Sequence, residues 1–242
     1  MIATHALRTI WLCRAVGFLS FMSAEARWDA PRSYDSVLSI GAQCLTSTML
    51  KAAGLKRYSA PFDWIFSNLR MVSDCIEDDF AVFLDRRHLK PVPVEQRHTA
   101  DSCFADHDHY RRRYGLNTMF NHYDPVSAEG YAYLERCVAR FRAALASGRP
   151  HLLLAIAERY QGGWFGFDRL CAALDSYPAI ELLVLISPER RAPQGLELWE
   201  QRGRHRLAYL HTPSPVAGIH FEAEEDNIFL GETLRRLIAL NR

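Results

Sequence analysis

Two short, almost uninterrupted apolar runs constrain the fold of this chain more than any other feature. They occupy residues 151–157 and 180–186, and each has the length of a single strand. A strand with one face in water alternates apolar and polar residues, so an unbroken apolar run indicates burial on both faces. Strands of this kind occur in parallel sheets that helices cover. The chain is therefore expected to contain a mostly parallel sheet.

Helical patterns lie between and around these strands. The pattern predicts an α/β fold, with the parallel sheet covered by helices on both faces in a three-layer, Rossmann-like arrangement. Residues 86–123 are rich in charge, His, Pro and aromatics without clear periodicity, which predicts a long irregular excursion of the kind that often carries function. The predicted strands are 36–40, 151–157, 180–186 and 206–210, and the predicted helices are 45–53, 69–83, 129–147, 165–174 and 227–239.

Length and composition favour one domain, at residues 34–242. A chain of 242 residues with 49% hydrophobic content can bury one sizeable core. The formal net charge is +1, from acids and bases spread along the chain, so neither a nucleic-acid partner nor a charged membrane surface is expected. The six cysteines are scattered without metal-site spacing, which predicts free and mostly buried thiols.

Residues 1–33 form an N-terminal extension with two interpretations. Arg8 and Arg14, the apolar run 15–22 and the small-residue pattern at 24–26 resemble a signal peptide. The alternative is a disordered or mis-started extension before the domain. We expect a cytoplasmic protein, or a secreted or periplasmic one if the extension is a signal peptide. No segment reaches the roughly 18 apolar residues that a membrane-spanning helix needs.

The turn Gly41-Ala42-Gln43-Cys44 is the best candidate for a functional site. It joins the predicted strand 36–40 to the helix that follows, and ligands bind at the carboxyl ends of the strands in such sheets. A thiol at a helix N-terminus is expected to have a lowered pKa, and the N–H groups near Gln43 and Cys44 could hold an oxyanion. The alternative is a small apolar cysteine packed beneath the turn.

Three short runs occur in a fixed order in the first half of the chain. They are SIGAQC at 39–44, APFDWI at 60–65 and FNH at 120–122. Together they resemble a family of uncharacterised bacterial and plant proteins labelled papain-like cysteine peptidases, over roughly residues 34–124. The resemblance implies Cys44 as nucleophile and His122 as its base. That family often has His-Asp at this point, whereas Tyr123 here separates His122 from Asp124.

A Cys–His pair needs a third group that orients the imidazole. Asp124 and Asp63 are the two candidates. Phe62 and Trp64 are expected to be two buried aromatics that anchor a rigid turn, and Asp63 between them is expected to line the pocket. The residues expected to bind substrate are Gly41, Gln43, Asp63, Trp64, Asn121 and Arg159.

The expected architecture also resembles the SGNH hydrolases, whose nucleophile follows the first strand of a parallel sheet. Cys44 stands where those enzymes have a serine. Residues 225–227 occupy the place of their Asp-x-x-His block, but no histidine follows Asp226. This resemblance leaves His122 or His220 as the base.

The run Asp106-His107-Asp108-His109 raises the question of a metal site, since residues two apart share one face of a strand. No third ligand stands at a diagnostic spacing, so a solvated polar loop is expected, with no metal and no cofactor. Two functions remain open. One is a cysteine-dependent hydrolase or acyl transferase acting on a peptide, glycan or small molecule. The other is a non-catalytic or glycan-related binding module, in which the aromatic-rich segment 110–123 binds a partner.

Overall fold

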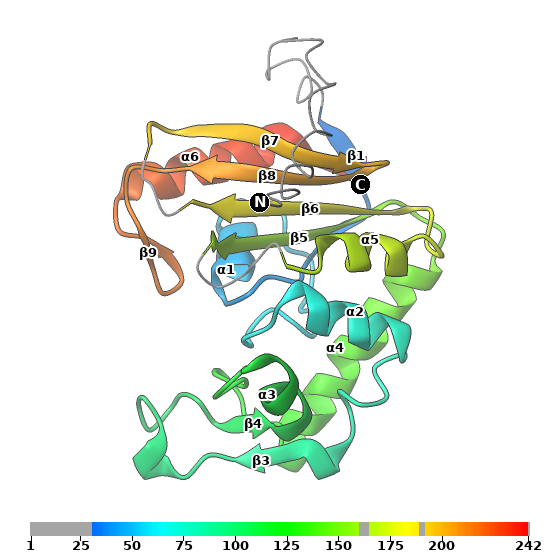
Figure 1. The fold of residues 1–242 in the computed structure, drawn as a ribbon, viewed down its shortest axis with the longest axis vertical. Coiled ribbons are helices and arrows are strands. Elements are labelled where there is room, and N and C mark those ends of the chain that lie inside the picture. Colours follow the sequence, from blue (N-terminus) through cyan, green and yellow to red (C-terminus); the bar gives the residue numbers. More distant parts are fainter. Residues whose placement is uncertain (1–30, 160–164, 189–191, 242) are drawn as a thin grey trace, which may run out of the picture.

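The central feature of the structure is a five-stranded sheet (Figure 1). The computed structural model describes residues 31–159, 165–188 and 192–241, and all structural statements below refer to these residues. Four strands are parallel and one edge strand is antiparallel, which confirms a mixed α/β fold with a mostly parallel sheet. In sheet order the strands are β2 (Ser36–Ser39), β5 (His151–Glu158), β6 (Ile180–Ser187), β8 (His205–His211) and β7 (Gly195–Arg202).

Strands β5 and β6 are buried along their whole length, as their apolar sequences require. Alternate residues enter two hydrophobic cores, because successive side chains of a strand point to opposite faces. Leu153 and Ala155 lie in the first core, and Leu152 and Leu154 lie in the second. The first core also contains side chains of α2 (Leu69–Glu77), α4 (Ala128–Ala146) and α5 (Phe167–Leu174), and the second contains side chains of α1 (Leu45–Ala52) and α6 (Glu224–Leu237).

The helix predicted at 69–83 is wrong beyond Glu77, where α2 ends. Asp79 and Phe80 have positive φ angles of 50° and 59°, which a helix cannot continue through. The Phe80 N–H donates to the Cys75 carbonyl at 2.7 Å and closes this turn. Phe80 and Phe83 are nevertheless buried in the first core. The apolar spacing of this segment therefore reports burial and not helical structure.

The segment 86–123 is more ordered than its sequence predicts. Its core residues Tyr110 and Phe120 are fully buried in the first core. It therefore belongs to the folded domain and is not an irregular excursion. Its elements are the 3₁₀ turns η2 (Arg86–His88) and η3 (Val94–Gln96), the antiparallel pair β3 (Leu89–Pro91) and β4 (Ala105–His107), and α3 (Asp108–Tyr114).

The solvated loop predicted around residues 106–109 is wrong. His107 is fully buried, and its Nε2 lies 3.2 Å from the Val82 carbonyl oxygen. Burial lowers the pKa of His107 to about 4, so the imidazole is neutral. Asp106 accepts a hydrogen bond from the Thr118 N–H. Within the described residues no group of three His, Cys, Asp or Glu side chains could hold a metal ion.

The C-terminal end also differs from the sequence-based expectation. The helix predicted at 227–239 begins at Glu224 and ends at Leu237, because the next residues form a strand. That strand, β11 (Ile238–Leu240), pairs in parallel with β1 (Arg32–Tyr34). Edge strand β7 and the short hairpin of β9 (Val216–Ala217) and β10 (His220–Phe221) were not predicted.

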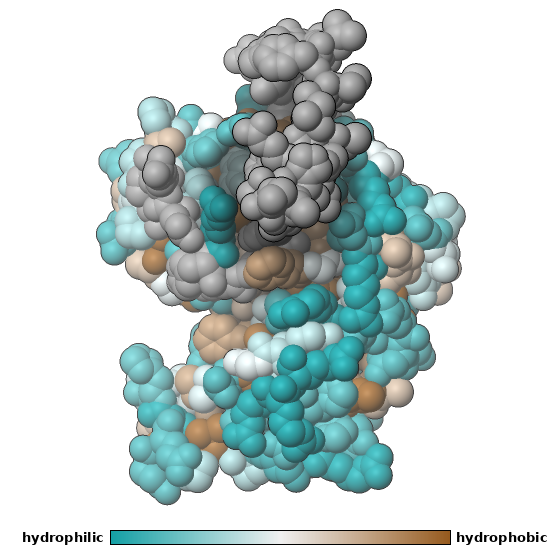
Figure 2. All heavy atoms as spheres, viewed as in Figure 1, coloured by the Kyte–Doolittle hydropathy of each residue, from teal (hydrophilic) through white to brown (hydrophobic). Residues whose placement is uncertain are grey.

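Two further expectations concern membranes and the N-terminus. None of the described helices is both long and apolar enough for a bilayer crossing. The signal-like segment lies in residues 1–30, outside the described residues. The face of the molecule in Figure 2 is mostly hydrophilic, and its hydrophobic residues lie in small separate groups.

Candidate active site

The loop at residues 60–67 brings the three sequence runs together. Ile65 forms an antiparallel bridge with Phe120, two residues before His122 in sequence. At the other end of the loop, Ser67 donates from its backbone N–H to the Ala42 carbonyl at 3.1 Å, and from its hydroxyl to the Gly41 carbonyl. Runs far apart in the sequence therefore meet beside the carboxyl end of β2, where ligands bind in sheets of this type.

Gly41 is required by the tight packing of this turn. A Cβ atom at this position would lie 2.1 Å from Oγ1 of Thr46. Thr46 cannot move away freely, because its hydroxyl accepts a hydrogen bond from the Ile156 N–H at 2.9 Å. Gly41 therefore allows α1 to pack closely against β5. Its expected contact with substrate stays a prediction.

Cys44 is the N-cap residue of α1, directly before the first helical turn. Its side chain is buried, with the residue 3% exposed. Burial raises the pKa of the Cys44 thiol to about 11, and the negative charge of Asp63 adds to this effect. The lowered pKa predicted from the helix dipole is therefore wrong for this state, because desolvation outweighs the helix N-terminus. Cys44 is a protonated thiol at neutral pH.

His122 lies on the molecular surface against Trp64, and the two ring centroids are 5.7 Å apart. Partial burial lowers the pKa of His122 below its ordinary value, so the imidazole is neutral at pH 7. Among the described residues, no hydrogen bond joins His122 to Cys44 or to Asp124. The catalytic pairing stays a prediction that requires the imidazole and thiol to approach each other.

Asn121 fixes the tautomer of His122. The Asn121 Oδ1 accepts the Cys103 backbone N–H at 3.1 Å and the Cys103 thiol at 3.3 Å. Its Nδ2 therefore faces His122, 3.3 Å from Nε2. Since the amide can only donate at this end, Nε2 accepts and the imidazole proton lies on Nδ1. Cys103 was not singled out from sequence, and only its spatial proximity to Asn121 shows this role.

The two candidate acids differ in their surroundings. Asp124 accepts the Val126 N–H at 2.9 Å and so shapes the loop before α4. Asp63 is fully buried, pairs with Lys56, and accepts the Ala60 N–H at 2.7 Å. It does not line the pocket described below, contrary to the sequence-based expectation. It affects the site through its negative charge, which helps to raise the pKa of Cys44.

The remaining sequence candidates are dispersed. Gln43 is half-buried in the turn, and Arg159 is exposed just beyond the end of β5. Asp226 accepts hydrogen bonds from Gln194 Nε2 and from the Ser214 backbone N–H, both at 2.8 Å, so it fixes structure at the start of α6. His220 is exposed and lines a different pocket, between α1 and α6.

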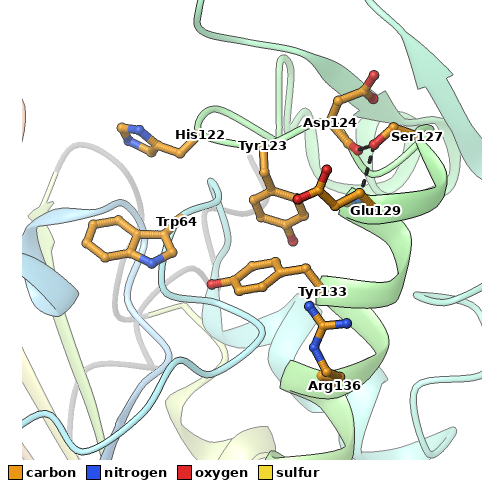
Figure 3. A pocket seen from close by; sticks show the side chains of 9 residues that line it. Trp64, His122, Tyr123, Asp124, Ser127, Glu129, Tyr133 and Arg136 are labelled. Atoms are coloured by element: carbon orange, nitrogen blue, oxygen red, sulfur yellow. Dashed lines mark hydrogen bonds between the residues drawn. The ribbon is translucent and has the colours of Figure 1, made fainter.

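A pocket of about 590 Å³ lies beside His122 (Figure 3). The half-buried Trp64 forms one wall, so it is not one of two buried anchors, whereas Phe62 is fully buried. The pocket residues Glu129, Tyr133 and Arg136 of α4 were not predicted, because they lie off its buried apolar stripe. The lining residues are Trp64, His122, Tyr123, Asp124, Ser127, Glu129, Gly130, Tyr133 and Arg136. A second pocket, of about 430 Å³, reaches the turn at Ala42.

Alkylation of Cys44 by iodoacetamide is expected to be at least about 100-fold slower at pH 7 than that of N-acetylcysteine, because a pKa of about 11 leaves far less thiolate than the free-thiol value of about 8.5. The rate should rise about tenfold per pH unit between pH 8 and 10. Mass spectrometry of each cysteine measures it. A midpoint below pH 8.5 would contradict the buried thiol and restore the helix-dipole prediction.

Residues 35–159 match the model of a family described as "Putative papain-like cysteine peptidase (DUF1796)". The match covers just over half of the chain and includes all three sequence runs. Comparisons with curated proteins and with solved structures find no similar chain.

Proposed function

Because the chain belongs to the papain-like cysteine peptidase family DUF1796, we propose that it is a cysteine-dependent hydrolase or acyl transferase with Cys44 as nucleophile. The observation that carries the proposal is the loop at 60–67, which holds the Cys44 turn and the His122 segment at one end of the sheet. A catalytic cysteine needs this proximity to a base. The proposal assigns His122 as that base.

The chemistry begins from a thiol and a neutral imidazole. Substrate binding brings His122 within reach of Cys44, which is consistent with the long catalytic contacts of many unliganded enzymes. The imidazole takes the thiol proton, Sγ bonds to the carbonyl carbon, and the bond to the leaving group breaks as His122 protonates that group. Water, or an acceptor in acyl transfer, then cleaves the thioester and restores the thiol.

The start of α1 supplies groups that suit a developing oxyanion. The N–H groups of a first helical turn have no partner within the helix, and the positive end of the helix dipole lies there. In the proposal, the N–H groups near Gln43 and Cys44 hold the oxyanion. Asn121 positions His122, and either Asp124 or Asp63 stabilises the imidazolium after a rearrangement.

The proposal extends to an SGNH-like, three-layer arrangement. Cys44 follows the first strand of the parallel sheet, as the nucleophile does in those enzymes. The two hydrophobic cores, which take alternate residues of β5, support helical layers on both sides of the sheet.

Mapping of an acyl-enzyme tests the nucleophile. The protein is incubated with p-nitrophenyl acetate, quenched in acid and digested, and each cysteine peptide is examined for an added acetyl group. We expect the thioester on Cys44, its loss in Cys44→Ala, and its retention in Cys171→Ser, the control at another buried thiol, on α5. An acetyl group found on other cysteines alone, or on Cys44 only after denaturation, would refute the assignment.

One observation favours the second candidate, a non-catalytic binding module. Cys44 is nearly inaccessible and does not line the pocket that contains His122. If Cys44 stays unacylated while the pocket binds a ligand, the binding module replaces the hydrolase as the better description.

A further inference from the structure

The pocket beside His122 has walls of aromatic rings. Trp64 and His122 form one side, in an edge-to-face contact. Tyr123 and Tyr133 form the floor, also edge-to-face, with ring centroids 5.0 Å apart. No aliphatic side chain lines the pocket among the described residues. The rings offer flat faces on which a ligand can stack.

Charged side chains of both signs surround these rings. Glu129 and Arg136 both come from α4 and are separated by seven residues, or roughly 10 Å of helix rise. Both are exposed, and neither forms an ion pair in the part of the chain that the structure describes. Figure 3 shows them on either side of Tyr133. The pocket therefore offers a strong acceptor and a strong multiple donor that no partner occupies.

This combination does not suit a ligand that carries a single charge. A cation would face Arg136, and an anion would face Glu129 and Asp124. An uncharged ligand with many hydroxyl groups suits both signs, because hydroxyl groups can donate to carboxylates and accept from a guanidinium. The ring walls require that it also present an apolar face.

We propose that this pocket is a carbohydrate subsite, which binds one sugar ring through stacking on Trp64 and hydrogen bonds to Glu129 and Arg136. The volume of about 590 Å³ lies within the roughly 300–1,000 Å³ of small-molecule sites. The inference deepens the proposed function, because His122 belongs to both sites and the substrate would then carry its acyl group on or near a sugar. The binding itself does not depend on Cys44.

Sugar binding is tested on the full chain with a Cys44→Ala substitution, so that failure of the catalytic proposal leaves this test intact. The probes are methyl glycosides of common hexoses and N-acetylhexosamines, measured by saturation-transfer NMR and titration calorimetry. At least one is expected to bind, with about tenfold weaker affinity in Trp64→Ala and in Glu129→Gln. Trp199→Ala, a matched control on edge strand β7, should leave the affinity unchanged.

Three outcomes would overturn the inference. One is that no probe binds to a folded protein, with folding checked by circular dichroism. A second is that binding persists unchanged in both Trp64→Ala and Glu129→Gln. The third is that acetylcholine or N-acetylarginine amide binds through Glu129 while no sugar does, which would identify the pocket as a cation site.

Discussion

Replacing His122 with alanine is expected to slow p-nitrophenolate release from p-nitrophenyl acetate by about 10²–10⁴-fold, the usual contribution of a general base. Alkylation of Cys44 by iodoacetamide in the absence of substrate should remain unchanged. The reason is that no hydrogen bond joins the two side chains in the described structure, so His122 cannot set the resting thiol pKa. Stopped-flow absorbance measures the first rate, and mass spectrometry measures the second.

The difference between these two rates separates a catalytic role from a structural one. A residue that only holds the site together would alter both rates, because its loss would expose or rearrange Cys44. His98→Ala removes an exposed histidine elsewhere and should alter neither. If turnover survives in His122→Ala but fails in His220→Ala, the base is His220 and the SGNH comparison is the better guide.

The main elements around the sheet could be predicted because burial leaves a local signature in sequence. The unbroken apolar runs of β5 and β6 and the apolar spacing of α4 are such signatures. The end of α2 could not be predicted, since Phe80 and Phe83 continue its apolar spacing while the backbone leaves the helix. Periodicity reports which side chains are buried, and several backbone shapes can bury the same side chains.

The candidate site could also be predicted only in part from the sequence. The strand-turn-helix order identified Cys44 and the turn that carries it, because this relation is local in sequence. The raised pKa of Cys44 could not be predicted, because it depends on how deeply the folded chain buries the thiol. The pocket residues Tyr133 and Arg136 were missed for the same reason. Only the fold brings Trp64 to the start of α4.

The buried pair of Lys56 and Asp63 leads to the largest expected loss of stability. Lys56→Met is expected to lower the free energy of unfolding by about 3–5 kcal/mol, because it leaves a fully buried carboxylate without its cation. Methionine is unbranched and only one atom shorter than lysine, so lost packing contributes little. Urea denaturation measures the change, and Lys51→Met, at an exposed position of α1, should cost less than about 0.5 kcal/mol.

The pH dependence of this loss identifies its cause. Burial already raises the pKa of Asp63, and the charge of Lys56 opposes that rise. Without Lys56 the folded-state pKa rises further above the unfolded value of about 3.8, so the folded state holds the proton more tightly than the unfolded state. The variant should therefore lose stability as pH rises above about 4. As pH falls towards 4, its stability should approach that of the wild type.

Adding Asp63→Asn to Lys56→Met should restore most of the stability at neutral pH, since the uncompensated charge is then gone. If the variant is destabilised equally at all pH values, Lys56 stabilises the fold through packing and not through its charge. Its packing partner would be Trp64, whose ring centroid lies 5.8 Å from the Lys56 Nζ.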